Sequence, residues 1–422
     1  MVKFRSPDSI WLGFLKTSND RIVCEPFPIF TLTFHSIMKK FTFKTLLALL
    51  MLIPFGMLSA EDIFQKITIP EIDISQETAW QVLTDREAGQ YLGHVTTCLL
   101  DDGKTILCVY PKGHGRGAIV YKKSFDGGQT WSDRLPTPQN WETSLEVPTI
   151  HRTIDANGKK RIIMFSGLYP ARMAVSEDEG ETWSELKSVG DWGGIVVMGD
   201  VVPLQTGKGH YMAMFHDDGR YLASTKQTDA GFTLFKTFST DGGQTWSFPE
   251  AILNSKEIHP CEPGIVRSPN GKRLAVLLRE NRRVQNSQVI FSDDEGKTWT
   301  EMRPLPAALN GDRHTIRYLN DGRLFVSFRE MSIKPNETPF KGDWVAWIGT
   351  FEDIEKGKEG QYRIRIMDNK RGNDSTYPGI VVLPDGKVVT TTYGHWTENE
   401  QPYIMTVRID PKKTDTMVRE KK

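Results

Sequence analysis

The residues of this chain that could do chemistry stand at the two ends of short apolar segments. Six apolar segments open with a polar or aromatic residue, namely His94, Glu146, Asp200, Glu262, Arg313 and Tyr377. The segments that follow end in a second set, which includes His114, Arg116, Asp217, Asp218, Arg279, Arg329, Tyr393 and His395. Arginines beside acids and rings are the composition of a site that binds an anionic sugar.

A repeat in the sequence indicates which elements position these residues. Four copies of the pattern S-x-D-x-G-x-T-W begin at Ser124, Ser176, Ser239 and Ser292, 52 to 63 residues apart. The Asp side chain can accept backbone N–H groups within a turn, and Gly supplies positive φ, so each copy predicts a hairpin turn. The aspartates of these Asp boxes are therefore expected to be structural and not catalytic.

A second repeated phrase lies upstream of each box: an apolar strand, a turn of Asp-Gly or Asn-Gly type, and another apolar strand. Six such hairpins, about 60 residues apart, predict an all-β, six-bladed β-propeller with four-stranded antiparallel blades over residues 61–422. Helical periodicity is nearly absent outside residues 352–358. Because the innermost strand of each blade runs along the central axis, both residue sets should converge on one face, with the boxes on the other.

The N-terminal part of the sequence is not expected to belong to the propeller. Residues 38–60 combine a lysine-rich start with an apolar run over residues 46–58, which is typical of a signal peptide and short for a membrane span. We expect cleavage after Ala60, a free secreted or periplasmic protein, and no membrane span in the mature chain. We expect Met38 to be the true start, with residues 1–37 a mis-assigned extension.

The bulk composition limits the classes of partner. The chain has 53 Lys plus Arg and 53 Asp plus Glu, so no basic excess suggests nucleic acid. Four histidines could meet at the mouth of a propeller, but their spacings match no metal-ligand motif; these are His94, His114, His151 and His216. We therefore expect neither a metal nor a cofactor.

With four Asp boxes in six blades, the chain resembles the sialidase (neuraminidase) superfamily over residues 80–410. The sequence around Glu262, followed by Arg279, is similar to the glutamate and arginine of that family's fourth blade. The sequence around Tyr377 is similar to its nucleophilic tyrosine, and Arg329 matches its fifth-blade arginine. The resemblance implies an exo-acting, retaining hydrolase that removes terminal sialic acid, with Glu262 taking the proton of Tyr377 and arginines binding the substrate carboxylate.

Blade one departs from the family pattern. His94 stands where an arginine that binds the carboxylate is expected, and the loop over residues 111–117 contains no acid where the family has its acid/base aspartate. Arg116 in this loop could supply the missing guanidinium. The proton donor is left open between His114 and a blade-three acid, Asp217 or Asp218. Glu146 and Arg313 remain as rim residues that could bind substrate.

Two other functions remain open. The changed blade-one motif is compatible with a glycosidase or lyase for another acidic sugar, such as a uronic acid or another ulosonic acid. A non-catalytic glycan-binding propeller would not need Glu262 and Tyr377 together at strand openings, so their presence counts against it. In every case the expected partners are sialylated or other acidic glycans.

Overall fold

The computed structural model describes residues 66–190, 197–219, 231–334 and 337–421. The expected extension (residues 1–37) and signal segment (residues 38–60) lie outside the described residues. Within the described part of the chain, no helix is both long enough and apolar enough to cross a membrane.

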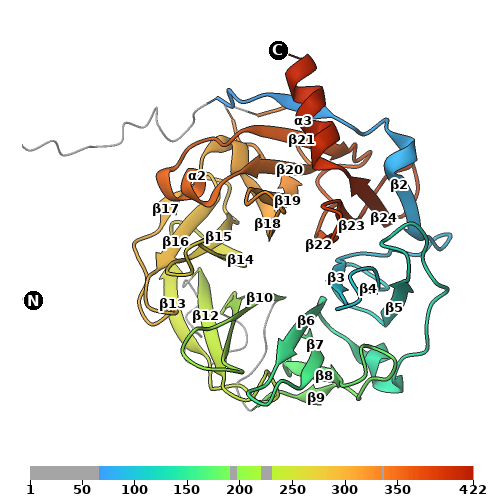
Figure 1. Ribbon diagram of the computed structural model, residues 1–422, viewed down its shortest axis with the longest axis vertical. Coiled ribbons are helices and arrows are strands. Elements are labelled where there is room, and N and C mark those ends of the chain that lie inside the picture. The colour runs from blue at the N-terminus through green and yellow to red at the C-terminus, as the bar shows by residue number, and fades with distance from the viewer. Residues whose placement is uncertain (1–65, 191–196, 220–230, 335–336, 422) are drawn as a thin grey trace, which may run out of the picture. The chain divides into compact units, whose positions relative to one another are not determined.

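The described strands form six sheets arranged around a central axis (Figure 1). Blade 1 consists of β3 (Thr96–Leu99), β4 (Ile106–Pro111) and β5 (Ile119–Ser124). Blade 2 consists of β6 (Pro148–Ile154), β7 (Lys160–Ser166), β8 (Arg172–Ser176) and β9 (Lys187–Ser188). Blade 3 consists of β10 (Val197–Pro203), β11 (Tyr211–Asp217), β12 (Phe232–Ser239) and β13 (Glu250–Ser255). Blade 4 consists of β14 (Pro260–Arg267), β15 (Leu274–Glu280), β16 (Gln288–Ser292) and β17 (Arg303–Pro304). Blade 5 contains β18 (Gly311–Tyr318), β19 (Leu324–Glu330), β20 (Trp344–Gly349) and β21 (Tyr362–Met367). Blade 6 contains β22 (Gly379–Val382), β23 (Val388–Gly394) and β24 (Tyr403–Ile409).

The predicted six-bladed propeller is confirmed, with a difference in blade 1. As described, that blade has three strands, because the chain after β5 runs beside it without forming a regular fourth one. The amides of Ser132 and Leu135 still donate to β5 carbonyl oxygens. Pro136 and Pro138 follow at once, and proline has no N–H with which to continue a ladder.

The N-terminal strands close the ring. Strand β2 (Gln81–Asp85) pairs antiparallel with β24 and completes blade 6, while β1 (Glu71–Asp73) adds to blade 5 parallel to β21. Figure 1 shows the blue start of the described chain beside its red end. The two ends are thus held by backbone hydrogen bonds, which fixes blade 6 against blade 1.

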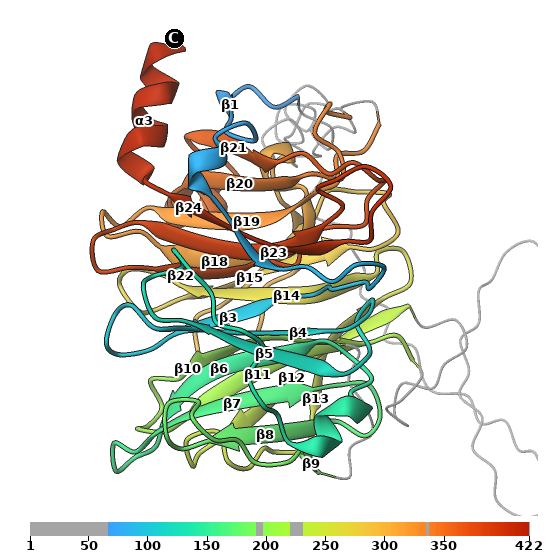
Figure 2. The same cartoon turned by 90° about the vertical axis from the view of Figure 1, so that its right-hand side faces the viewer.

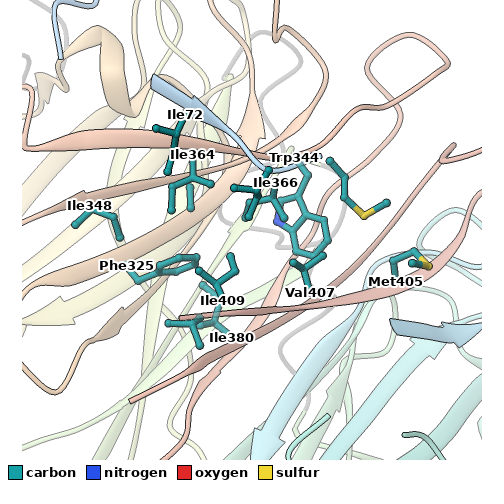
Figure 3. Close-up of a cluster of buried hydrophobic side chains, with 14 of the residues drawn as sticks. Ile72, Phe325, Trp344, Ile348, Ile364, Ile366, Ile380, Met405, Val407 and Ile409 are labelled. Atoms are coloured by element: carbon teal, nitrogen blue, oxygen red, sulfur yellow. The ribbon is translucent and has the colours of Figure 1, made fainter. Parts of the chain in front are cut away.

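Hydrophobic clusters fill the spaces between neighbouring blades. The cluster between blades 5 and 6 is built around Trp344, with Phe325 and Ile364 on one side and Val407 on the other (Figure 3). Comparable clusters lie at the other blade junctions. Because a blade is covered on both faces, its middle strands are apolar on both faces, as in β4 and β15.

Helices are few among the described residues. They are the short 3-10 turns η2 (Thr78–Trp80), η3 (Gln139–Thr143) and η5 (Ala307–Leu309) and the helices α2 (Phe351–Lys356) and α3 (Pro411–Glu420). Helix α2 lies close to the expected stretch; a capping box of Thr350 and Asp353 starts it, and Gly357 at φ 65° ends it. Helix α3 follows β24 at the C-terminus (Figure 2) and was not expected from the sequence.

The Asp boxes are hairpin turns, as predicted. In the first box, Asp126 Oδ1 accepts the amide of Thr130 at 2.9 Å and Asp126 Oδ2 accepts its hydroxyl at 2.7 Å. Ser124 Oγ accepts the amide of Gly128 at 2.8 Å. The same three bonds recur in the other three boxes, so these aspartates are committed to the turns.

Candidate active site

The openings of four innermost strands share an uncommon backbone conformation. His94, Glu262, Arg313 and Thr376 have φ of 49°, 52°, 56° and 58°, in the left-handed region that non-glycine residues rarely adopt. In blades 4 and 5 this residue sits in a bulge, where the pairing register shifts. Such a conformation costs of order 1–3 kcal/mol per residue, and a bulge re-aims a side chain. The strained openings therefore hold these side chains, and Tyr377 after Thr376, at the axis.

Glycines let the innermost strands approach one another at this level. A Cβ on Gly264 would lie 2.1 Å from the carbonyl oxygen of His314 in blade 5, and a Cβ on Gly379 would lie 2.7 Å from the amide nitrogen of Thr97 in blade 1. No larger residue fits without moving backbone. The close approach brings side chains from distant blades into contact.

Tyr377, Glu262 and Arg279 form the centre of the site. The Tyr377 hydroxyl donates to Glu262 Oε1. Arg279 Nη1 donates to the same oxygen at 2.8 Å and lies 3.4 Å from Tyr377 Oη. Glu262 Oε2 has no hydrogen-bond partner among the described residues. Three residues that the sequence placed in one site are thus in direct contact.

The protonation states of this pair follow from burial and charge. Burial alone would raise the pKa of Glu262, but the Arg279 guanidinium lowers it, so Glu262 is ionised. Burial, followed by the negative charge of Glu262, raises the pKa of Tyr377 well above its ordinary value. The resting site therefore holds a neutral phenol beside a carboxylate that can accept its proton.

Cations and a neutral ring surround the Tyr377 ring. The Cζ atoms of Arg313 and Arg329 each lie 5.9 Å from its centroid, a cation–π geometry. The His94 ring lies 4.3 Å away, edge-on. Burial lowers the pKa of His94 well below its ordinary value, so it is neutral. His94 therefore packs against Tyr377 and adds no positive charge to the site.

Asp312 neutralises the arginine cluster, and no motif in the sequence marks it as a site residue. Its carboxylate is fully buried and accepts from Arg329 Nε at 3.1 Å and Nη2 at 2.5 Å. Arg283 Nη2 donates to it at 2.7 Å, and Arg279 Nε lies 3.3 Å from it. Arg329 Nη1 donates to the Ser375 carbonyl oxygen. Arg329 is thus engaged on both its edges, whereas Arg279 is partly exposed.

The blade-one loop places His114 and Arg116 near Glu146. His114 and Arg116 are exposed, and Glu146 lies under the loop, where a Cβ on Gly115 would be 3.0 Å from Glu146 Oε1. Burial raises the pKa of Glu146 to about 7, against the opposing effects of the Val147 amide and Arg116. Glu146 can therefore carry a proton at neutral pH.

Asp374 is a second acid that sequence reasoning missed. It lies three residues before Tyr377 and accepts from Tyr91 Oη at 2.7 Å and Tyr393 Oη at 3.3 Å. His114 Nδ1 is 3.5 Å and His395 Nε2 3.3 Å from its oxygens. Burial would raise the pKa of Asp374, but the bonds from His114 and Tyr91 hold it well below its usual range.

The blade-three acids lie beside a different part of the site. Asp217 is fully buried at the end of β11 and accepts the Gly219 amide at 2.9 Å. Asp218 follows it and interacts electrostatically with His216. The His216 ring faces the Glu262 backbone, whose amide donates to His216 Nδ1 at 3.4 Å. A fully buried Asp217 is poorly suited to reach a leaving group.

Along the axis next to Arg313 lies a cavity of about 40 Å³, lined in part by Asp200, His151 and Arg317. The same three residues also line a wider cavity of about 450 Å³. Arg313 reaches the smaller cavity and donates to the Met198 carbonyl oxygen at 3.2 Å. Asp200 is the fourth residue of β10, so it does not open its strand as expected from the sequence, and it lines the smaller cavity. Among the described residues, no three His, Cys, Asp or Glu side chains gather as a metal site.

Comparison with known proteins places this geometry in a family. The BNR repeat-like domain matches residues 165–390. An anhydrosialidase from Macrobdella decora is 27% identical over 245 residues, covering 54% of this chain and 30% of the relative. A sialidase from Paraclostridium sordellii is 28% identical over 178 residues, covering 37% of this chain and 43% of the relative. The match thus spans less than half the length of either relative.

The fold is shared more widely than the sequence. An α-L-arabinofuranosidase from Fusarium graminearum, solved with an iminosugar inhibitor, superimposes with a TM-score of 0.56 at 14% identity, covering 78% of this chain and 97% of that chain. At this identity the likeness concerns the fold alone. Together with the family match over more than half of its residues, the six-bladed ring and the four Asp boxes, this shows that the chain belongs to the BNR repeat-like family of sialidase-superfamily propellers.

Proposed function

We propose that this protein is a retaining exo-glycoside hydrolase that removes a terminal sialic acid or a related acidic sugar. The observation that carries the proposal is the hydrogen bond from Tyr377 to the ionised Glu262, with Arg279 on the same carboxylate oxygen. A glycan-binding propeller has no use for a buried phenol–carboxylate pair at the axis. The sialidases among its relatives favour the same class of reaction.

In the proposed reaction Tyr377 Oη attacks the anomeric carbon while Glu262 takes its proton. A neutral nucleophile suits an acidic sugar, because the substrate carboxylate would repel a second carboxylate. The proton must move during attack, since the pKa of Tyr377 is raised well above its ordinary value and the phenol is not ionised beforehand. The partly exposed Arg279 and the exposed Arg116 are the guanidinium groups best able to bind the carboxylate.

A second candidate function is favoured by Asp312. This residue neutralises Arg329, and His94 is neutral where an arginine is expected, so the site is less cationic than a carboxylate-binding triad requires. A sugar without a carboxylate would not repel Glu262. Glu262 Oε2 could then attack directly, with Tyr377 orienting Oε1. An α-L-arabinofuranosidase has a propeller of similar fold, so the fold is compatible with a reaction on such a sugar.

One experiment distinguishes the two candidates. The protein is incubated with a fluorogenic α-sialoside and, separately, with an aryl α-L-arabinofuranoside, and the fluorosugar analogue of the substrate that is hydrolysed is used to trap the covalent intermediate for peptide mass spectrometry. A sialosyl adduct on the Tyr377 peptide supports the first proposal. An arabinosyl adduct on the Glu262 peptide supports the second, and hydrolysis of neither substrate refutes both.

The proposal extends to location. The lysine-rich and apolar segment at residues 38–60 supports export and removal of that segment, so that the propeller acts in the periplasm or outside the cell on sialylated or other acidic glycans. Mass spectrometry of the protein purified from its native cell envelope and medium checks this, because an exported chain begins at residue 61.

A further inference from the structure

Three side chains from separate parts of the chain form a hydrogen-bonded row at the rim of the site. Tyr91 comes from the segment before β3, His114 from the loop between β4 and β5, and Asp374 from the segment that leads to Tyr377. Tyr91 Oη lies 2.7 Å from Asp374 Oδ1 and 2.7 Å from His114 Nδ1. The phenol therefore bridges the imidazole and the carboxylate.

The direction of each hydrogen bond follows from counting protons. Burial, and then the neighbouring Tyr393 and Asp374, raise the pKa of Tyr91 well above its ordinary value, so Tyr91 keeps its one proton. The ionised Asp374 can only accept, and Tyr91 therefore donates to it. The Tyr91 oxygen is left to accept from His114, which must carry a proton on Nδ1. The row thus fixes the tautomer of His114 and leaves Nε2 as the nitrogen that can exchange a proton.

His114 stands close to the nucleophile and open to a ligand. Its side chain is 65% exposed. Its ring centroid lies 4.6 Å from that of His94, which lies 4.3 Å from that of Tyr377. Asp374 is ionised and Asp217 is fully buried, so neither is suited to give a proton to a leaving group.

We propose that His114 Nε2 is the catalytic acid and base of the site, and that Tyr91 and Asp374 are positioning residues that hold it in one tautomer. This rests on the proposed function, because the site must cleave a glycosidic bond and use Tyr377 as its nucleophile. In the first step the bond between Tyr377 Oη and the anomeric carbon forms, Glu262 takes the phenol proton, and imidazolium His114 gives its Nε2 proton to the departing oxygen. In the second step water attacks the anomeric carbon, the bond between that carbon and Tyr377 Oη breaks, His114 Nε2 takes the water proton, and Glu262 returns its proton to the Tyr377 oxygen.

The tautomer is measured without any substrate. Two-bond ¹H–¹⁵N NMR spectra of the full protein labelled with ¹⁵N-histidine resolve the two ring nitrogens, and His114→Gln assigns the signal. We expect neutral His114 to be the Nδ1–H form in the wild type and a mixture in Tyr91→Phe and Asp374→Asn. His210→Gln, on the Asp-box side of the ring, is the matched control and leaves the His114 signal unchanged. The proposed hydrogen-bonded row is wrong if neutral His114 is the Nε2–H form in the wild type. It is also wrong if the His114 signal is the same in the wild type, Tyr91→Phe and Asp374→Asn.

The acid role is measured with leaving groups of different acidity. His114→Gln should lose about 10²–10⁴-fold in kcat/KM on 3′-sialyllactose. It should lose less than about tenfold on 4-methylumbelliferyl α-sialoside, whose phenolate leaves with little help. Tyr91→Phe and Asp374→Asn should show the same contrast in smaller degree, which a merely structural lesion would not produce. Glu146→Gln should show no such contrast; if it does and His114→Gln does not, Glu146 is the acid and the proposal is wrong.

The design separates this proposal from the choice of sugar. If the wild type cleaves neither sialoside, the sialidase assignment fails, and the same comparison is made with an aryl α-L-arabinofuranoside and arabinobiose. The proposal is still supported if the loss is larger on arabinobiose than on the aryl arabinofuranoside, and only in the variants of His114, Tyr91 and Asp374. Absence of hydrolysis of all four substrates by the folded protein overturns the catalytic role of His114, and the NMR spectra then report on the row alone.

Discussion

Tyr377 and Glu262 share one hydrogen bond although 115 residues separate them in the sequence. The acceptor, Glu262 Oε1, also receives Arg279 Nη1 at 2.8 Å. The phenol proton therefore already faces a carboxylate that a guanidinium keeps ionised, and no rearrangement is needed before it moves.

Removing either partner should abolish turnover. Tyr377→Phe deletes the attacking oxygen, and Glu262→Gln deletes the group that takes its proton. We expect each to lower kcat/KM on the hydrolysed glycoside by about 10³-fold or more, measured by fluorogenic assay.

The matched control for the tyrosine is Tyr318→Phe, whose hydroxyl donates to the Arg267 carbonyl oxygen at the far end of its strand. That variant should retain wild-type kcat/KM. A Tyr377→Phe protein with more than a tenth of wild-type activity would contradict the tyrosine nucleophile and favour direct attack by Glu262.

Asp312→Asn should destabilise the protein strongly. The carboxylate is fully buried and is the shared counter-charge of Arg279, Arg283 and Arg329, so its neutralisation leaves buried cations uncompensated. We expect a loss of about 3–5 kcal/mol in the free energy of unfolding, measured in urea. Asp293→Asn, which removes an exposed partner of Arg273, should cost no more than about 1 kcal/mol. Equal costs for the two variants would show that Asp312 is not the hub of the cluster.

Glu146 should make the stability of the fold depend on pH. Its pKa is raised from 4.5 to about 7, so between these values the folded protein holds a proton that the unfolded chain has released. The free energy of unfolding should therefore fall as the pH rises through this window and level off above pH 7. The effect is about 3 kcal/mol at most, since a pKa difference of one corresponds to about 1.4 kcal/mol.

The measurement is urea unfolding of the wild type and Glu146→Gln at pH 5 and pH 8. The fall in the free energy of unfolding from pH 5 to pH 8 should be smaller in Glu146→Gln than in the wild type. The exposed Glu142, changed to Gln, is the control and should leave the difference as it is in the wild type. A larger fall in the Glu146 variant would show that the pKa of this carboxyl is not raised.

Asp126→Ala should affect stability and leave the chemistry unchanged. The carboxylate accepts two backbone amides and two hydroxyls in the first Asp box, so its removal should cost about 1–3 kcal/mol in the free energy of unfolding. The kcat/KM should stay at the wild-type value. Phe125→Ala, at an exposed neighbour, is the control for stability. A tenfold fall in kcat/KM with intact folding would show that this aspartate has a functional role beyond the turn.

Several features of the fold and site were readable from the sequence because they are local or periodic. The Asp boxes use side-chain bonds within five residues, and the hairpin turns repeat every 60 residues or so, which predicted the blades and their number. The strand openings gave Glu262, Arg313 and Tyr377 for the same reason. The closure of blade 6 by β2 depends on pairing between segments far apart in the sequence, and no local pattern predicted it.

The sequence by itself determined the blade repeat, the Asp-box turns and the set of polar residues at the axis, because each depends on patterns spanning a few residues. Only the tertiary structure decided how those residues are paired. Asp312 and Asp374 lie just before the strand-opening positions in the chain, and no spacing marks them as partners of arginines or of His114. They become partners because bulges and glycines bring six strands together around one axis, where a buried charge must find a counter-charge that can lie far away in sequence.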